Sequence, residues 1–140
     1  MFGLHVDSVE AHCGSHYDQA QMGAWFAQRS GENYRSAVEQ GALWIAEADS
    51  EPVGFTEFFP GLISMLFVRG GASGRGVGLR LLGFAVNGAT VGAGGVIKLE
   101  STLNARVFYE RNGFEAVGSG HLSRPGGVDL PTIRMQRRLE

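Results

Sequence analysis

Apolar residues in the first third of the chain recur at the spacing of an amphipathic helix, with polar residues around the rest of each turn. Gly14 interrupts the first of these stretches, and two further helical stretches follow it. The pair Ser15 and Asp18 resembles a capping box ahead of the second. The pattern therefore predicts three helices: one carrying Phe2, Val6, Val9 and Cys13, one over about residues 17–29 and one over about residues 33–40.

The pattern changes to that of strands after residue 41. Apolar or aromatic runs separated by a polar turn are typical of a hairpin, and the turn at residues 48–51 separates two such runs. We expect strands over residues 42–47, 53–59, 62–68, 96–101, from 114 onward and over 130–138, a loop over residues 123–129, and helices after the glycines near residue 76 and from residue 104. A helix between two strands predicts a parallel pair joined by a right-handed crossover. The sequence thus predicts an α/β fold in one domain, residues 1–140, with helices packed on a mixed sheet.

A glycine-dense loop follows the strand predicted at residues 62–68. Gly74, Gly76 and Gly78 precede or open the next helix, where N–H groups have no intrahelical partner and lie at the positive end of the dipole. Glycines leave those donors open to a phosphate. The chain holds 22 glycines in 140 residues, well above the usual roughly 7%, so the cluster taken alone is also compatible with a simple turn.

Two familiar phosphate-binding motifs fit this loop poorly. A Walker loop needs Lys-Ser or Lys-Thr after its last glycine, and Leu79 follows Gly78 instead. A Rossmann fingerprint needs a third glycine three residues after Gly76 and belongs after the first strand of a βαβ unit. Leu79 occupies that position, and the loop follows a predicted hairpin in the middle of the chain.

The loop resembles that of the GNAT superfamily of acyl-CoA-dependent acetyltransferases. Ser73-Gly74-Arg75-Gly76-Val77-Gly78 matches the family pattern except at its first position, where Ser73 replaces a long polar side chain, and Gly70 stands where the family often has proline. A second stretch, Leu99-Glu100-Ser101 followed by residues 104–114, resembles the next strand and helix of that family. The two matches occur in the expected order and cover about the last half of the chain.

The resemblance implies the GNAT fold, a mixed and mostly antiparallel sheet whose parallel central strands splay apart between flanking helices. Since the first predicted element is a helix, we expect the usual first strand of the family to be absent from this sheet. An open sheet edge invites pairing with another chain. Dimerisation through this edge is therefore a hypothesis, which a compact monomer in sedimentation would remove.

The resemblance also implies that acetyl-CoA enters the gap between the splayed strands and serves as co-substrate. The main chain of one strand would pair with the pantetheine amides like an added strand, and the loop would hold the diphosphate. The residues implied are Leu66, Phe67 and Val68 for pantetheine, Ser73, Gly74, Arg75, Gly76, Val77, Gly78 and Leu79 for the diphosphate, Asn104 and Phe108 for the pantetheine arm, and Arg111 for the nucleotide phosphates.

Acetyl transfer to an amine requires a neutral nucleophile and a proton for the departing thiolate. Tyr109 occupies the family's thiol-protonating position, although a core aromatic role is an alternative. Glu57 is the first candidate for the base and Glu100, at the mouth of the splay, is a second, with a solvated strand carboxylate or a pairing with Lys98 as alternatives. On the acceptor side the resemblance points to His5, Tyr17, Trp25 and Glu100, with ordinary packing as the alternative for the first three.

Composition excludes several other classes of function. A formal net charge of −2 offers no general attraction for nucleic acid or acidic membranes. No apolar run reaches the roughly 18 residues of a membrane span, and no secretory signal is expected at the N-terminus. Cys13 is the only cysteine and suits a reducing cytoplasm, and the four histidines lack convincing metal-ligand spacing. We therefore expect a metal-free, cytoplasmic enzyme.

The acceptor cannot be read from these patterns beyond an amine of a small molecule or peptide, and the acyl group could be acetyl or longer. The main rival is a non-catalytic module that binds or senses acyl-CoA, which the missing strand and Ser73 favour and the pair Asn104 and Tyr109 disfavours. A dinucleotide-binding oxidoreductase is a distant third hypothesis.

Overall fold

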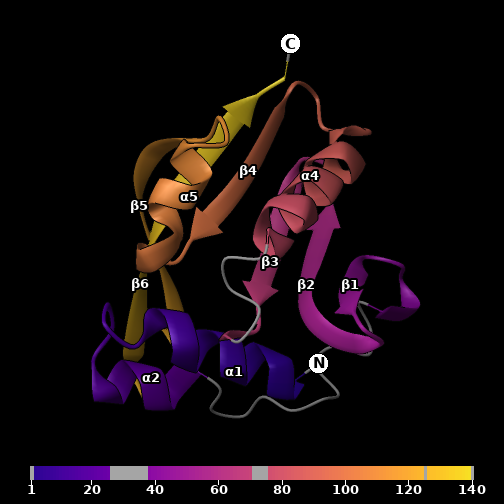
Figure 1. The fold of residues 1–140 in the computed structure, drawn as a ribbon. Coiled ribbons are helices and arrows are strands. Elements are labelled where there is room, and N and C mark those ends of the chain that lie inside the picture. The colour runs from indigo at the N-terminus through magenta and orange to yellow at the C-terminus, as the bar shows by residue number, and fades with distance from the viewer. Residues whose placement is uncertain (1, 26–37, 71–75, 125, 140) are drawn as a thin grey trace.

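The computed structural model describes residues 2–25, 38–70, 76–124 and 126–139 (Figure 1). The elements in chain order are α1 (Phe2–Cys13), α2 (Gln19–Trp25), β1 (Leu43–Ala48), β2 (Glu51–Phe59), β3 (Leu62–Val68), α4 (Val77–Thr90), β4 (Val96–Ser101), the 3₁₀ helix η2 (Leu103–Ala105), α5 (Arg106–Glu110), β5 (Glu115–Arg124) and β6 (Val128–Arg138).

Six strands form one sheet in the order β1-β2-β3-β4-β6-β5. Every neighbouring pair is antiparallel except β3 and β4, which are parallel and connected through α4. This confirms the predicted mixed sheet and its parallel central pair. Gly61, in the left-handed conformation at φ 74°, makes the tight turn from β2 into β3.

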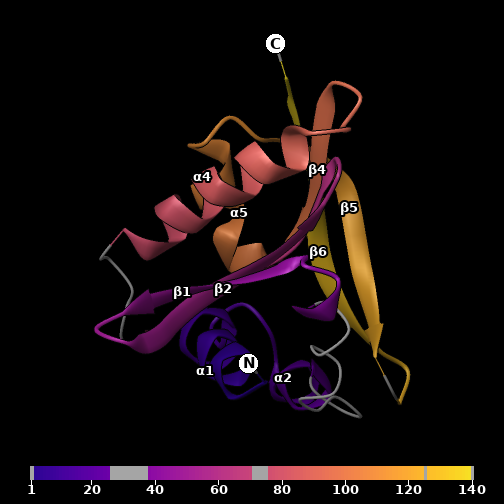
Figure 2. The ribbon, with the colours of Figure 1, turned by 90° about the vertical axis from the view of Figure 1, so that its right-hand side faces the viewer.

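Helices cover both faces of the twisted sheet. Figure 2 shows α4 and α5 on one side of the strands and α1 and α2 on the other. The larger core lies under α4 and α5 and contains Ile63, Leu82, Ala85, Ala89, Ile97, Leu99, Tyr109, Phe114 and Met135. A second cluster holds α1 and α2 against β6 through Val9, Cys13, Tyr17, Trp25 and Leu130.

The predicted boundaries of several elements were wrong by a few residues. The capping box at the start of α2 is made by Asp18 and Gln21, not by Ser15 and Asp18: the Gln21 N–H donates to Asp18 Oδ1 at 2.7 Å and the Asp18 N–H to Gln21 Oε1 at 2.9 Å. The helix therefore begins later than expected, because glutamine serves as the return acceptor. β5 and β6 likewise continue into the loop predicted at residues 123–129, up to Arg124 and from Val128. Most of the third predicted helix lies outside the described residues.

β1 is the outer strand on its side of the sheet, and within the described residues no strand precedes α1. Trp44 and Ile45 on this strand remain 46% and 45% exposed. Phe84 on α4 lies half exposed and meets the Trp44 ring edge-on, with the ring centroids 5.2 Å apart. The pairing of this edge with a second copy of the chain stays a prediction.

Candidate functional site

The site is opened by the divergence of the two parallel strands, which Figure 1 shows at the carboxyl end of β3. β3 and β4 pair only at Leu62 with Lys98 and at Ile63 with Leu99. Beyond these pairs a cleft of about 420 Å³ lies between them. Its walls are residues 63–68 of β3, residues 76–79 at the start of α4, residues Ser8, His12 and Cys13 of α1, and Leu99, Glu100, Thr102, Asn104, Ala105, Phe108 and Tyr109.

The β3 wall offers main-chain groups to a ligand. β2 pairs with β3 as far as Val68 on one side, whereas β4 has already left the other side. Backbone groups of successive strand residues face opposite edges, and the Arg69 N–H donates to the Val53 carbonyl on β2, so Phe67 faces β2 and Leu66 faces the open edge. Since an extended ligand can bind an open strand edge by main-chain hydrogen bonds, Leu66 is placed to receive one. At Val68 the carbonyl oxygen already accepts a hydrogen bond from His12 Nε2 at 3.1 Å, so the contacts available there are fewer than the sequence predicts.

The start of α4 forms the end of the cleft. Gly76 is the N-cap residue in the left-handed conformation, φ 77°, and has no side-chain cap hydrogen bond. A Cβ at Gly78 would lie 3.6 Å from both Phe108 Cζ and Val68 Cγ2, so a side chain there would narrow the cleft. The free N–H groups and the dipole of this 14-residue helix favour an anion. Ser73, Gly74 and Arg75, predicted in the same loop, lie outside the described residues.

Asn104 is held from behind by α1. The Cys13 thiol, at the end of α1, donates to Asn104 Oδ1 at 3.1 Å. Burial raises the pKa of Cys13 to about 11, so the thiol keeps its proton at neutral pH and remains a donor. With its oxygen engaged, the Asn104 side chain retains its N–H₂ donors for a ligand in the cleft.

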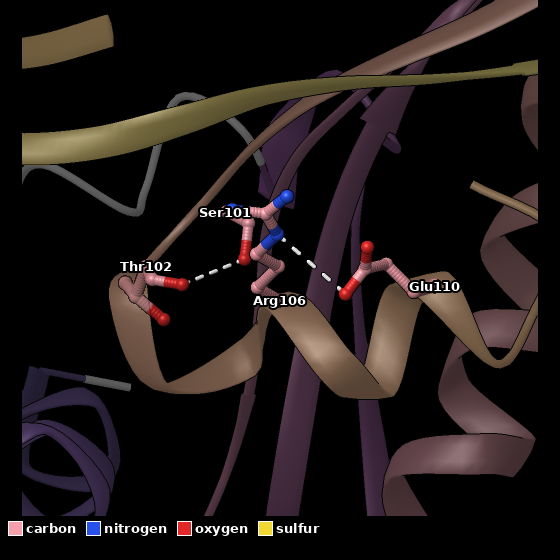
Figure 3. Close-up of polar contacts among 4 residues, drawn as sticks. All are labelled: Ser101, Thr102, Arg106 and Glu110. Atoms are coloured by element: carbon pink, nitrogen blue, oxygen red, sulfur yellow. Dashed lines mark hydrogen bonds and ion pairs between the residues drawn. The ribbon is translucent and has the colours of Figure 1, made fainter. Parts of the chain in front are cut away.

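The turn from β4 into α5 is fixed by local polar contacts, drawn in Figure 3. Ser101, 1% exposed at the end of β4, donates its hydroxyl to the Thr102 carbonyl oxygen at 2.7 Å. Arg106 and Glu110 form an ion pair on α5, Nε to Oε1 at 3.5 Å, which as an exposed i, i+4 pair contributes only about 0.3–0.5 kcal/mol. The turn's geometry thus depends on the buried serine more than on the ion pair.

Tyr109 and Phe108 lie on the cleft wall, whereas Arg111 does not. Tyr109 is only 6% exposed, and burial raises the pKa of its hydroxyl. The phenol therefore stays protonated and can act only as a proton donor at neutral pH. Arg111 is exposed just after α5 and is not among the residues lining the cleft.

The two carboxylates predicted near the chemistry are both bound to hydroxyls. Ser64 lines the cleft and donates to Glu57 Oε1 at 2.6 Å, while Glu57 itself lies behind it. Glu100 lines the cleft directly and accepts a hydrogen bond from Thr132 Oγ1 on β6 at 3.1 Å. Glu100 is thus held by the neighbouring strand rather than by Lys98.

His5, Tyr17 and Trp25 lie in the core beneath the cleft and are not among its lining residues. His5 packs between the rings of Phe55 and Phe67. The Tyr17 hydroxyl accepts from the Leu103 N–H at 3.1 Å and donates to the Pro131 carbonyl at 2.6 Å, with Trp25 edge-on at 5.0 Å. These contacts give the three residues packing roles that join α1 and α2 to the sheet and to η2.

Several cleft residues were missed by the sequence reasoning. Ser8 and His12 lie four positions apart on α1 and both line the cleft. Because residues four apart share a helix face, this spacing could have predicted that they lie together. Ser64 and Thr102 gave no comparable signal. Among the described residues there is no cluster of three or more potential metal ligands, and none of the described helices has the length and apolarity to span a membrane.

Comparison with known proteins gives a consistent match. Residues 13–134 match the family model described as the acetyltransferase (GNAT) domain. A curated relative, the uncharacterized N-acetyltransferase YafP of Escherichia coli K12, is 27% identical over 114 residues, which cover 81% of this chain and 72% of the relative.

Two solved structures share the fold. A GCN5-related N-acetyltransferase of Rhodopseudomonas palustris superposes with a TM-score of 0.88 at 27% identity, covering 98% of this chain and 86% of that one. The PaiA N-acetyltransferase of Thermoplasma acidophilum, solved in complex with coenzyme A, gives a TM-score of 0.71 at 17% identity, covering 98% of this chain and 89% of that one.

Proposed function

Because the chain belongs to the GNAT acetyltransferase family, we propose that it transfers an acetyl group from acetyl-CoA to the primary amine of a small molecule or peptide. The observation that carries this proposal is the cleft between β3 and β4, which joins an open strand edge to an uncapped helix start. An elongated ligand that ends in a diphosphate needs this combination of amide partners and anion site.

Different residues of the chain would bind different parts of acetyl-CoA. The main chain of residues 66–68 would pair with the pantetheine amides, with His12 competing at Val68. The loop at residues 73–79 would hold the diphosphate through its backbone N–H groups. Asn104, oriented by Cys13, would donate to the pantetheine arm, and Phe108 would pack against it. Arg111, exposed beyond the cleft wall, would meet only the nucleotide end.

Tyr109 is proposed as the general acid. When bound, acetyl-CoA supplies an activated acyl group whose release requires a proton on the sulfur. The buried Tyr109 hydroxyl, whose pKa is raised by desolvation, is a donor held at the cleft wall. An ordinary phenol has a pKa near 10 and an ordinary thiol a pKa near 8.5, and burial raises the pKa of Tyr109 further, so the phenol is the weaker acid of the two. It would therefore give up its proton as the carbon–sulfur bond breaks and negative charge develops on the sulfur.

The base is proposed at Glu57, which acts through Ser64. The amine must lose a proton before it attacks, and the Ser64 hydroxyl lies on the cleft wall with its hydrogen donated to Glu57 Oε1 at 2.6 Å. Ser64 can therefore accept a hydrogen bond from the incoming amine while its own proton points to a carboxylate. Glu100, on the cleft wall itself, is proposed to face the acceptor instead.

The test is release of free thiol from acetyl-CoA across a panel of primary amines, followed by absorbance with a thiol reagent. We expect amine-dependent thiol release for at least one amine, and an acetylated product of the corresponding mass. Binding of coenzyme A by calorimetry without thiol release for any amine would instead support a non-catalytic module that binds acyl-CoA. Absence of both would contradict the proposal.

A further inference from the structure

A second hollow lies on the outer face of the sheet, over β4 and β6. Its volume is about 430 Å³, and it shares Leu99 and Glu100 with the cofactor cleft. Two exposed apolar side chains, Leu62 and Val117, line it as well. A ligand in this groove would therefore reach the cleft at the point where β3 and β4 begin to separate.

The polar side chains of the groove are set by strand register. Glu100 pairs with Arg134, and Lys98 pairs with Gln136. Since residues two apart and residues paired across an antiparallel ladder share a face, all four project on the outer side. The alternate residues of the same strands, among them Leu99 and Met135, are buried under α4 and α5. The groove thus contains two cations and one carboxylate, with the carboxylate at the junction to the cleft.

Glycines on β5 make room for this arrangement. A Cβ at Gly120 would lie 2.7 Å from Thr132 Oγ1, 3.2 Å from Arg134 Cγ and 3.3 Å from Glu100 Oε1. A Cβ at Gly118 would lie 3.3 Å from Arg134 Nη2. Glycine is unfavourable inside a strand and marks places where another group approaches closely. Here the groups that approach are the arginine and the threonine–glutamate pair.

The cations of the groove outnumber its carboxylates. Glu100 lies across the strands from Arg134 and accepts a hydrogen bond from Thr132, and among the described residues neither Lys98 nor Arg134 forms an ion pair. In a chain whose net charge is −2, a local excess of positive charge beside the cleft favours an anionic group on a ligand.

We propose that this groove binds the acceptor and that the acceptor is a small primary amine bearing a carboxylate. The inference rests on the proposed acetyl transfer. The carboxylate of the acceptor lies against Arg134 and Lys98, where a guanidinium can bind it through two parallel hydrogen bonds. Its amine lies toward Glu100 and the cleft. A diamine of the same length would bring a second positive charge to the two cations and is a poor acceptor.

The experiment compares acceptors matched in length: 4-aminobutanoate, butylamine and 1,4-diaminobutane. We expect kcat/KM with acetyl-CoA to be at least about tenfold higher for 4-aminobutanoate than for butylamine, because a charged hydrogen bond contributes about one to two factors of ten. In Arg134→Gln and Lys98→Gln this ratio should fall toward one. The matched control is Arg138→Gln, because Arg138 is exposed farther along β6 and does not line the groove. In this variant the ratio of kcat/KM for 4-aminobutanoate to that for butylamine should equal the ratio for the unsubstituted protein.

A second readout does not need turnover. In the presence of coenzyme A, titration with 4-aminobutanoate should shift the amide resonances of Lys98, Glu100, Gly118 and Gly120, and Arg134→Gln should weaken the titration. Equal kcat/KM for the three amines, or identical behaviour of Arg134→Gln and Arg138→Gln, would overturn the inference and leave acetyl transfer standing. Resonance shifts without acetylation of any amine would overturn the proposed reaction and keep the groove. Neither shifts nor acetylation would overturn both.

Discussion

The two edges of β4 behave in opposite ways. Toward β6 the strand is paired along its whole length, from Val96 with Arg138 to Ser101 with Ile133. Toward β3 it is paired at two positions only. The closed edge keeps the strand in place and orders the outer side chains, while the open edge exposes backbone groups and creates the cleft. The pairing of β4 with β6 keeps the strand in the sheet where its hydrogen bonds to β3 end.

This contrast assigns different tasks to the two sides. The β3 side, together with the start of α4, has main-chain donors and few charges, which suits the proposed binding of acetyl-CoA. The β6 side has Lys98, Glu100 and Arg134 on its outer face, where side-chain charge can select one acceptor among many. The predictions below separate chemistry, cofactor binding and support of the open edge.

The largest effect is expected from Tyr109→Phe. Loss of the buried hydroxyl removes the proton donor and should lower kcat by about 100-fold, the lower end of the usual contribution of a general acid, since a thiolate is already a fair leaving group. The dissociation constant of coenzyme A, measured by calorimetry, should stay within about twofold. An unchanged kcat would refute the acid role.

The next largest effect is expected at the start of α4. Gly78→Ala places a methyl group in the cleft, 3.6 Å from Phe108 and Val68, and should raise the dissociation constant of coenzyme A by about tenfold. Gly83→Ala is the matched control, because Gly83 lies on the same helix with no atom within 4 Å of the added carbon. Gly83→Ala, in the helix interior, should stabilise the helix by roughly 0.5–1 kcal/mol, and Gly78→Ala, in the first turn, by less. Equal affinity in the two variants would contradict the placement of the cofactor.

A smaller effect is expected from Cys13, which lines the cleft and donates a hydrogen bond to Asn104. Cys13→Ala should raise the dissociation constant of coenzyme A about three- to tenfold, because Asn104 loses the donor that orients it. Cys13→Ser keeps a donor and should recover most of the affinity. Both substitutions remove a buried sulfur atom and should lower the melting temperature. The test of the positioning role is therefore the affinity for coenzyme A, not the stability. If the serine and alanine variants bind coenzyme A equally weakly, the contact has no positioning role.

The smallest effect concerns stability at alkaline pH. Below about pH 9 the Cys13 thiol is protonated in both the folded and the unfolded chain. Between about pH 9 and about pH 11 the unfolded chain loses this proton while the folded chain keeps it, so the free energy of unfolding should fall as pH rises. Urea denaturation at several pH values should show a shallower fall for Cys13→Ala. Parallel curves for the two proteins would show that burial leaves the thiol's pKa unchanged.

Much of the fold could be predicted because periodicity reports it directly. Apolar or aromatic runs bounded by turn residues located every strand within a few positions, and a helix between β3 and β4 fixed their parallel direction. The capping box was misplaced because the sequence allows Asp18 to be either the last residue of a box with Ser15 or the first residue of a box with Gln21. The backbone conformation selects the second arrangement.

The site was predictable where a local motif marks it and not where distant segments meet. The glycines and Asn104, Phe108 and Tyr109 lie in contiguous motifs, and all of the described ones line the cleft. Packing of α1 onto the sheet brought His12 to Val68 and Cys13 to Asn104, contacts 56 and 91 residues apart in the chain. The outer groove depends on the register of β4 against β6, which no short motif encodes.

The central claim is that coenzyme A lies in the opening between β3 and β4 with its diphosphate at the start of α4. A crystal structure of the protein with coenzyme A tests it most directly. We predict density for the pantetheine arm beside residues 66–68, with the diphosphate within hydrogen-bond distance of the backbone N–H groups near Gly76 and Gly78. Density for the cofactor anywhere else on the protein, with this opening free of it, would contradict the account.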